Sequence, residues 1–250
     1  MIIGIMGAMP EEVASIHQLM TDTEAVDHGS RHYYQGYINN IPVVLVFSRW
    51  GKVAASSTVT ALITEFNITH LIFTGVAGAA ASYLNIGDII LSQTLYQHDM
   101  DARPLLKRHE IPLTGCTFFE ADTQLVQFAC QAADQLTTTL TEHVSNTTLK
   151  RFSINAPNYY TGTIATGDQF ISDISHAESL LPQTDALEME GAAVAQVCHD
   201  YMIPFVIMRT ISDKADAASE IDFPAFIQDI ASVYSKCLIE SVFESLASYS

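Results

Sequence analysis

The chain has 250 residues, of which 48% are hydrophobic and 16% charged, and its formal net charge at pH 7 is −17. A chain of this length can bury one large core, so we expect a single domain spanning residues 1–250. The negative charge argues against a nucleic-acid partner and disfavours anionic small molecules, whereas an uncharged nucleoside meets no such repulsion.

The cysteines and the first residues bear on the cellular compartment. The four cysteines lie far apart without a CxxC pair, and Cys198 and Cys237 fall on apolar faces of expected helices, where free thiols are common. The apolar stretch at residues 1–6 is too short for a signal core, and no apolar run reaches the ~20 residues that a membrane span needs. We therefore expect a cytoplasmic protein without a membrane partner.

Short apolar runs alternate with helical periods in the first part of the chain. Pro10 followed by two acids marks a helix start, because the helix dipole favours acids in the first turn. Asn39-Asn40 separates two β-rich runs and suits a two-residue hairpin turn. The glycine-rich segment 75–78 is expected to be a turn that lets the backbone approach a ligand. We expect strands at 2–6, 33–38, 42–47, 70–74 and 88–96, and helices from Pro10 and over 51–66.

The second part continues this alternation, with one exception. Residues 141–158 are polar and lack a clear period, so we interpret them as a surface excursion. The last helix begins at Asp222 and carries apolar residues at the spacing of a stripe that packs on a sheet. Further helices are expected at 121–140, 174–181 and 191–201, and strands at 159–165, 186–189 and 205–211.

The alternation predicts an α/β fold, a three-layer α/β/α sandwich with a mixed, largely parallel central sheet. In such sheets, ligands bind beyond the strand ends. Glu188-Met189-Glu190 and the segment from Arg209 to Asp213 lie at two such ends. They offer a carboxylate that can grip a ribose and a second one that can donate a proton, which is chemistry on a nucleoside.

These acids also have purely structural interpretations. Ser212-Asp213 after a strand is a common helix cap, and acids such as Glu12 or Glu190 at a helix start interact with the dipole. Glu188 shares a face with Glu190 on extended backbone, and two close carboxylates would raise one pKa. We therefore expect Glu188 to turn outward or to pair with a cation.

Six motifs in collinear order resemble the 5′-methylthioadenosine/S-adenosylhomocysteine nucleosidases of the nucleoside phosphorylase superfamily. They are MGAMPEEV (6–13), TGVAG (74–78), HDMD (98–101), TGDQFI (166–171), EME (188–190) and RTISD (209–213). The resemblance covers nearly the whole chain. It implies a nucleoside phosphorylase-like fold and a homodimeric hydrolase without a cofactor. This enzyme would cut the N-glycosidic bond of 5′-methylthioadenosine and S-adenosylhomocysteine, giving adenine and the 5-thioribose.

The resemblance also implies roles for individual residues. Asp213 would protonate N7 of the leaving adenine, with Ser212 orienting its carboxyl and Arg209 biasing its charge. Glu12 would activate the attacking water, as the second carboxylate does in glycoside hydrolysis. Glu190 would accept hydrogen bonds from the ribose hydroxyls as positive charge develops on the sugar.

The remaining implied contacts surround the substrate. Met189 would pack on the ribose, Phe170 and Ile171 would hold adenine, and the backbone of Val76, Ala77 and Gly78 would approach sugar or base. The 5′-thio group would be enclosed by Met9, Trp50 and Phe223, with Leu105 and Pro112 contributed by the partner subunit. Trp50 replaces a small aliphatic residue and Val76 a serine of the family pattern. The size of the 5′ pocket therefore stays open.

Other functions stay open at this point. The paired acids Glu11-Glu12 would repel phosphate, which favours a hydrolase over a purine nucleoside phosphorylase. The same chemistry could act on 6-amino-6-deoxyfutalosine. A noncatalytic nucleoside-binding module ranks last, because all three expected acids are present. His98, Asp99, Asp101 and His109 could suggest a metal site, but no further His or Cys has ligand-like spacing, so we expect no metal.

Overall fold

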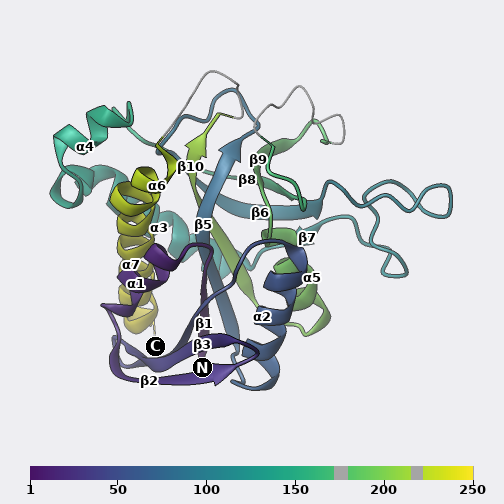
Figure 1. Ribbon diagram of the computed structural model, residues 1–250, viewed down its shortest axis with the longest axis horizontal. Coiled ribbons are helices and arrows are strands. Elements are labelled where there is room, and N and C mark those ends of the chain that lie inside the picture. Colours follow the sequence, from purple (N-terminus) through teal and green to yellow (C-terminus); the bar gives the residue numbers. More distant parts are fainter. Residues whose placement is uncertain (172–179, 215–221, 250) are drawn as a thin grey trace.

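A computed structural model describes residues 1–171, 180–214 and 222–249 (Figure 1). Most of the helix expected at 174–181 therefore lies outside the described residues. None of the described helices is long and apolar enough to cross a membrane. The strands are β1 (Ile3–Gly7), β2 (Thr21–His28), β3 (Arg31–Ile38), β4 (Ile41–Phe47), β5 (His70–Ala79), β6 (Ile89–Gln97), β7 (Phe119–Glu120), β8 (Tyr159–Thr166), β9 (Thr184–Glu188) and β10 (Phe205–Asp213).

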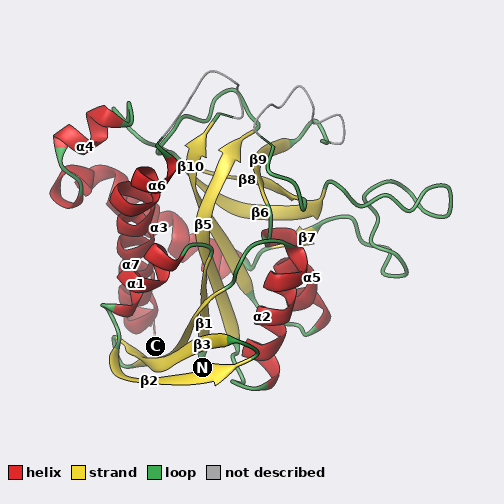
Figure 2. Cartoon of the chain, in the orientation of Figure 1, coloured by secondary structure: helices red, strands yellow, loops and turns green. Residues whose placement is uncertain are grey.

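The helices form two layers on the faces of the sheet (Figure 2). Along β1, Ile3 and Ile5 face the layer of α1, α3 and α7, whereas Met6 faces the layer of α2 and α5, as strand alternation requires. The expected three-layer α/β/α arrangement is confirmed. The helices are α1 (Pro10–His17), α2 (Lys52–Thr64), α3 (Thr123–His143), α4 (Asn146–Arg151), α5 (Gly191–Asp200), α6 (Phe223–Phe226) and α7 (Ser232–Tyr249), with a π-helical turn at Ile227–Ala231 between the last two.

The sheet is mixed, as expected, but it is not largely parallel. Among the described strands, antiparallel pairings such as β5–β9 and β6–β10 are as common as parallel ones such as β1–β5 and β5–β10. Strands β5, β10, β6, β8 and β9 pair in a closed ring, and β1, β4, β3 and β2 extend from β5 as an open sheet. The ring brings the ends of β5, β9 and β10 together.

The segment 75–78 is part of strand β5, so the expected turn there is wrong. Its glycines provide space instead. A Cβ atom on Gly75 would lie 2.8 Å from the Cβ of Ala8, and one on Gly78 would lie 2.9 Å from Asp213 Oδ1. The strand therefore continues while its bare backbone admits the neighbouring side chains.

Three other expectations need correction, and one is confirmed. The stretch 141–158 is not a surface excursion, because α3 extends to His143, α4 follows, and Leu149 and Phe152 are buried in the core. Strand β2 was not expected, since nearly all its residues are exposed. The last helix contains the π-helical turn. The hairpin turn is confirmed, with Asn39 and Asn40 at φ values of 48° and 63°.

Candidate active site

A cavity with an empty volume of about 620 Å³ lies where β5, β9 and β10 come together, beside the loop that follows β1. Its lining includes most of the residues expected to bind substrate. The lining residues are Ala8, Met9, Trp50, Val76, Ala77, Gly78, Phe170, Leu187, Glu188, Met189, Glu190, Ser212, Asp213 and Phe223.

Asp213 ends β10 and presents its carboxyl to the cavity. The register of β10 against β5 shifts between Ile211 and Asp213, and such bulges re-aim side chains. The hydroxyl of Ser212 donates a hydrogen bond to Asp213 Oδ2 at 2.8 Å. The carboxyl also packs against the bare backbone of Gly78. Neighbours on two strands thus fix its position.

Glu190 contributes a buried carboxylate to the same cavity, with 5% of its surface exposed. Its Oε1 accepts a hydrogen bond from the backbone N–H of Gly51 at 2.8 Å. Burial and, to a lesser extent, the nearby Glu188 carboxylate raise the pKa of Glu190 to about 7, although the Arg209 guanidinium opposes this. A carboxyl with this pKa changes its charge near neutral pH.

Glu188 also belongs to the cavity lining, and its carboxylate is held by four groups. It forms a buried ion pair with Arg209, whose Nη2 lies 2.8 Å from Oε2. It also accepts hydrogen bonds from the Thr166 hydroxyl and from the backbone N–H groups of Glu190 and Gly191. The expected pairing with a cation is confirmed, and the outward orientation is wrong.

Arg209 does not line the cavity, in contrast to its expected place beside the substrate. Only 1% of its surface is exposed, and its guanidinium lies 4.1 Å from the centre of the Phe73 ring. Its charge compensates Glu188. The sequence could not distinguish this long-range pairing from a contact with Asp213 four residues away.

Glu12 is fully buried directly behind Met9. Its Oε2 accepts the Met9 backbone N–H at 2.9 Å, and its Oε1 accepts the Ser235 hydroxyl at 2.8 Å. The Thr74 and Ser235 hydroxyl oxygens lie 2.6 Å apart, which extends this polar chain into β5. Burial raises the pKa of Glu12 to about 7. The helix-start role is therefore present, alongside contacts to α7 and β5 that such a role does not require.

Besides Glu12 and Arg209, three other expected residues are absent from the lining of the main cavity. Ile171 lines a smaller adjoining cavity together with Phe170, His98 and Asp213. Leu105 and Pro112 are exposed in the loop between β6 and β7, which projects from the body of the molecule (Figure 1). They do not contact the cavity of their own chain.

Sequence reasoning missed a polar cluster of Lys52, Asp99 and Asp168, here called the Lys52 clamp. Lys52 Nζ lies 2.7 Å from Asp99 Oδ1, and the Lys52 backbone N–H donates to Asp168 Oδ1 at 2.8 Å. The Asp168 N–H donates to Asp99 Oδ2 at 3.0 Å. The clamp ties the loop before Phe170 to the start of α2, next to Gly51. The sequence signal for this cluster was the position of its two aspartates, because Asp99 lies in the HDMD motif and Asp168 in the TGDQFI motif.

The residues weighed as metal ligands have other contacts. His98 packs against Gly167, where a Cβ atom would lie 2.2 Å from His98 Nε2, and Asp99 belongs to the Lys52 clamp. Within the described residues, no group of three or more His, Cys, Asp or Glu side chains could hold a metal ion.

Comparisons place this geometry among known proteins. A family model described as the phosphorylase superfamily matches residues 2–244. Two bacterial proteins named 5′-methylthioadenosine/S-adenosylhomocysteine nucleosidase are similar over nearly the full length. The Staphylococcus carnosus protein is 34% identical, over 95% of this chain and 97% of its own. The Oceanobacillus iheyensis protein is 35% identical, over 97% and 99%.

Solved structures of similar proteins include a nucleosidase of the same name and a futalosine hydrolase. A nucleosidase of this name from Colwellia psychrerythraea, in complex with adenine, superposes with a TM-score of 0.85 at 32% identity, over 98% of this chain and 96% of that one. A futalosine hydrolase from Helicobacter pylori superposes with a TM-score of 0.81 at 32% identity, over 97% of both chains.

Proposed function

This chain belongs to the 5′-methylthioadenosine/S-adenosylhomocysteine nucleosidase family of the phosphorylase superfamily, and we propose that it hydrolyses the N-glycosidic bond of these two adenine nucleosides. The observation that carries the proposal is the meeting of Glu190 and Asp213 in one cavity. One carboxylate can grip a ribose there, while the other reaches a purine bound beside it.

The leaving adenine needs a proton, and Asp213 is the acid that supplies it. The Ser212 hydroxyl fixes the orientation of the carboxyl, which faces the cavity where N7 would lie. Phe170 lines the same cavity and offers its ring to the base. Loss of the protonated base leaves positive charge on the sugar.

Glu190 stabilises the positive charge that develops on the sugar. As a carboxylate it accepts hydrogen bonds from the ribose hydroxyls, and these bonds strengthen as the sugar becomes cationic. Met189 packs on the ribose beside it. Arg209 compensates the charge of Glu188, so that Glu190 can ionise despite its neighbour. Arg209 therefore acts through Glu188 and not on the substrate.

Glu12 is the base that takes the proton of the attacking water. Its pKa of about 7 suits a group that accepts and releases a proton near neutral pH. Both of its hydrogen-bond donors, Met9 N–H and the Ser235 hydroxyl, are neutral. The carboxyl can therefore be protonated without leaving a buried cation unpaired.

The cavity favours water over phosphate as the nucleophile. None of the described residues that line it is Lys or Arg, and the guanidinium behind it is bound to Glu188. A phosphate dianion would lie near Glu12 and Glu190 without a compensating charge. This arrangement supports a hydrolase against a purine nucleoside phosphorylase.

We further propose a homodimer that works in the cytoplasm without a cofactor. Leu105 is 88% exposed and Leu113 is 99% exposed on the projecting loop, an apolar density that suits a contact with a second subunit. In that dimer Leu105 and Pro112 complete the partner's 5′-thio pocket beside Met9, Trp50 and Phe223. All four cysteines are free thiols, in keeping with a reducing compartment.

A second candidate substrate is 6-amino-6-deoxyfutalosine, which the similarity to the Helicobacter pylori futalosine hydrolase supports. The purified protein should be tested for release of the free base from this compound, 5′-methylthioadenosine and S-adenosylhomocysteine, which would each give adenine. The 6-oxo control is 5′-methylthioinosine, which would give hypoxanthine. We expect release from the two thio-nucleosides and none from the control. Adenine release from none of the three adenine compounds would contradict the proposal.

A further inference from the structure

A second cavity lies outside the active-site cavity, between α1 and the ends of β3 and β4. Its empty volume is about 1090 Å³, larger than that of the active-site cavity. No role assigned so far uses it. The lining residues are Pro10, Val13, Ala14, His17, Ser30, Arg31, His32, Tyr34, Phe47 and Arg49.

The charged residues that line this second cavity are basic, although the net charge of the whole chain is strongly negative. The chain contains 28 acidic residues and only 11 lysines and arginines, yet the described lining has two arginines, two histidines and no acid. Asp27, which is not among the lining residues, forms an ion pair with His32 of the lining when that histidine is protonated. Two arginines side by side repel one another, and such a pair is stabilised by an anion.

The two guanidinium groups are fixed in place by backbone oxygens. Arg31 donates to the carbonyls of Gly29 and Ala54 at 3.0 and 3.1 Å, and Arg49 donates to the carbonyl of Ser30. Neither arginine has a carboxylate partner among the described residues. The Arg31 Nε is buried and also lacks a partner within that part of the chain. Donors remain for a planar anion such as a carboxylate.

Electrostatics and backbone geometry agree with this arrangement. Burial lowers the pKa of Arg31 from its usual value, and the nearby Arg49 guanidinium contributes to this decrease, although Tyr33 opposes it. Arg49 adopts a φ of 60°, in the left-handed region that non-glycine residues rarely occupy. Residues held in such conformations are concentrated at functional sites.

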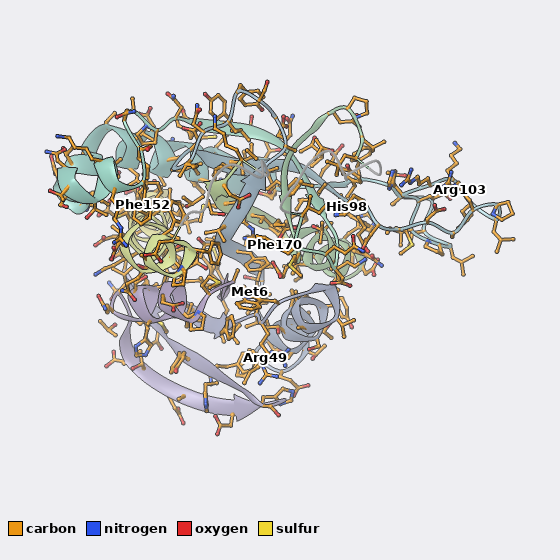
Figure 3. All side chains as sticks on the ribbon, turned by 45° about the horizontal axis from the view of Figure 1, so that its top comes forward. Met6, Arg49, His98, Arg103, Phe152 and Phe170 are labelled. Carbon is orange, nitrogen blue, oxygen red and sulfur yellow. The ribbon has the colours of Figure 1, made fainter. Side chains whose placement is uncertain are left out.

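The second cavity lies directly beside the active-site cavity. Met9 lines the active-site cavity and the next residue, Pro10, lines the second one. Likewise, Trp50 lines the active-site cavity and the preceding residue, Arg49, lines the second one. The Trp50 indole N–H donates to the Ala8 carbonyl at 2.9 Å, which holds Trp50 at the boundary between the two cavities. Figure 3 shows Arg49 below Phe170.

We infer that Arg49 and Arg31 bind a carboxylate at the far end of the substrate's 5′ substituent, so that the second cavity selects adenine nucleosides with an anionic 5′ tail. The inference rests on the proposed nucleosidase function and names the substrate class that this site prefers. It also explains how a strongly acidic protein can accept an acidic substituent, because the local charge is positive where the overall charge is negative.

The test uses two nucleosides of equal tail length, 5′-(3-carboxypropylthio)adenosine and 5′-butylthioadenosine. For the wild-type protein we expect KM to be roughly tenfold lower for the carboxylate compound, the gain of one guanidinium–carboxylate contact. In Arg49→Met and Arg31→Met this preference should disappear, while turnover of the butyl compound stays unchanged. Arg49→Lys should keep part of the preference, because it retains the charge but not the planar fork.

Lys150→Met serves as the matched control, because it removes one positive charge from α4. It should leave the preference intact. Equal KM values for the two nucleosides in the wild type would overturn the inference, as would a preference that survives in Arg49→Met. The wild type could show no preference between the two nucleosides while millimolar butanoate alters its turnover of the butyl compound. That result would overturn the inference and show that the site binds a free anion. Failure to cleave either nucleoside would count against the proposed function itself.

Discussion

At the scale of single residues, the site depends on where its buried charges are placed. Glu12, Glu188 and Glu190 are all buried, yet only Glu188 is paired with a guanidinium. The two unpaired carboxyls have a raised pKa of about 7, because burial disfavours their charged form. The structure thus contains one buried carboxylate bound to a guanidinium and two that titrate near neutral pH.

Asp213→Asn should abolish most turnover while binding is retained. The amide keeps the size of the side chain and its packing against Gly78, but it has no carboxyl proton to give. General acid catalysis contributes about 10²–10⁴-fold. Initial rates and calorimetric binding of 5′-methylthioadenosine measure the two effects separately. A turnover rate of Asp213→Asn within a few-fold of the wild-type rate would remove Asp213 from the mechanism. Ser212→Ala should lose less turnover than Asp213→Asn does.

The pH dependence of activity and that of stability should run in opposite directions at Glu12. Activity needs the ionised base, so kcat/KM should fall as the pH drops below about 7. The raised pKa means that the folded state holds the proton more tightly than the unfolded chain does. The contribution to stability is then fully present below about pH 4.5 and is lost as the pH rises through about 7.

Glu12→Gln measures both effects at once. Its unfolding free energy relative to wild type should increase by about 2–3 kcal/mol between pH 5 and pH 8, because only the wild type then buries a carboxylate charge. Its kcat should fall strongly, with little change in substrate affinity. Urea unfolding at the two pH values and steady-state kinetics give the readouts. A loss of affinity alone would make Glu12 a binding residue.

At the scale of secondary-structure elements, the sequence predicted those whose side chains have a buried face. The apolar runs of β1 and β4 and the Asn39-Asn40 turn have such local signals. Strand β2 has almost no buried residue, so it has no hydrophobic period to detect. Strand β5 was ended too early because Gly75 and Gly78 suggested a turn, whereas the glycines only make room for side chains from other elements. Such long-range contacts are not visible in one sequence.

The Lys52 clamp connects two of these elements, and its loss should loosen the ribose site. Lys52→Met removes the ion pair with Asp99 that holds the loop of Asp168 against the start of α2. Because the adjacent Gly51 N–H binds Glu190, we expect kcat/KM to fall about tenfold, mainly through KM. Lys236→Met on α7 is the control. An unchanged KM in Lys52→Met would show that the clamp is only structural.

At the scale of the whole molecule, the closed ring of β5, β10, β6, β8 and β9 brings segments more than a hundred residues apart to one cavity. Each motif is a short local segment, so it could be identified from the sequence. The order of the strands around the ring could not be predicted in this way, because it depends on contacts between distant segments. The same holds for charge. The net value of −17 argued against anionic ligands, whereas the fold gathers Arg31 and Arg49 at one cavity.

Assembly should be coupled to catalysis if the projecting loop completes a partner's pocket. Leu105→Asp places a charge on an apolar, exposed position of that loop. The dimer should weaken, and KM for 5′-methylthioadenosine should rise in parallel as monomer accumulates. Sedimentation and kinetics over the same protein concentrations measure this. A wild-type monomer with full activity would contradict the shared pocket.

The most direct test of the central claim is the identity of the sugar product. 5′-Methylthioadenosine should be incubated with the wild-type protein in phosphate-free buffer and, in parallel, in buffer with millimolar inorganic phosphate, and the products separated chromatographically. Because no cation among the described lining residues would hold phosphate, we predict equal rates of adenine release and free 5-methylthioribose in both buffers. Adenine release that requires phosphate, with the sugar 1-phosphate as the main product, would contradict the account.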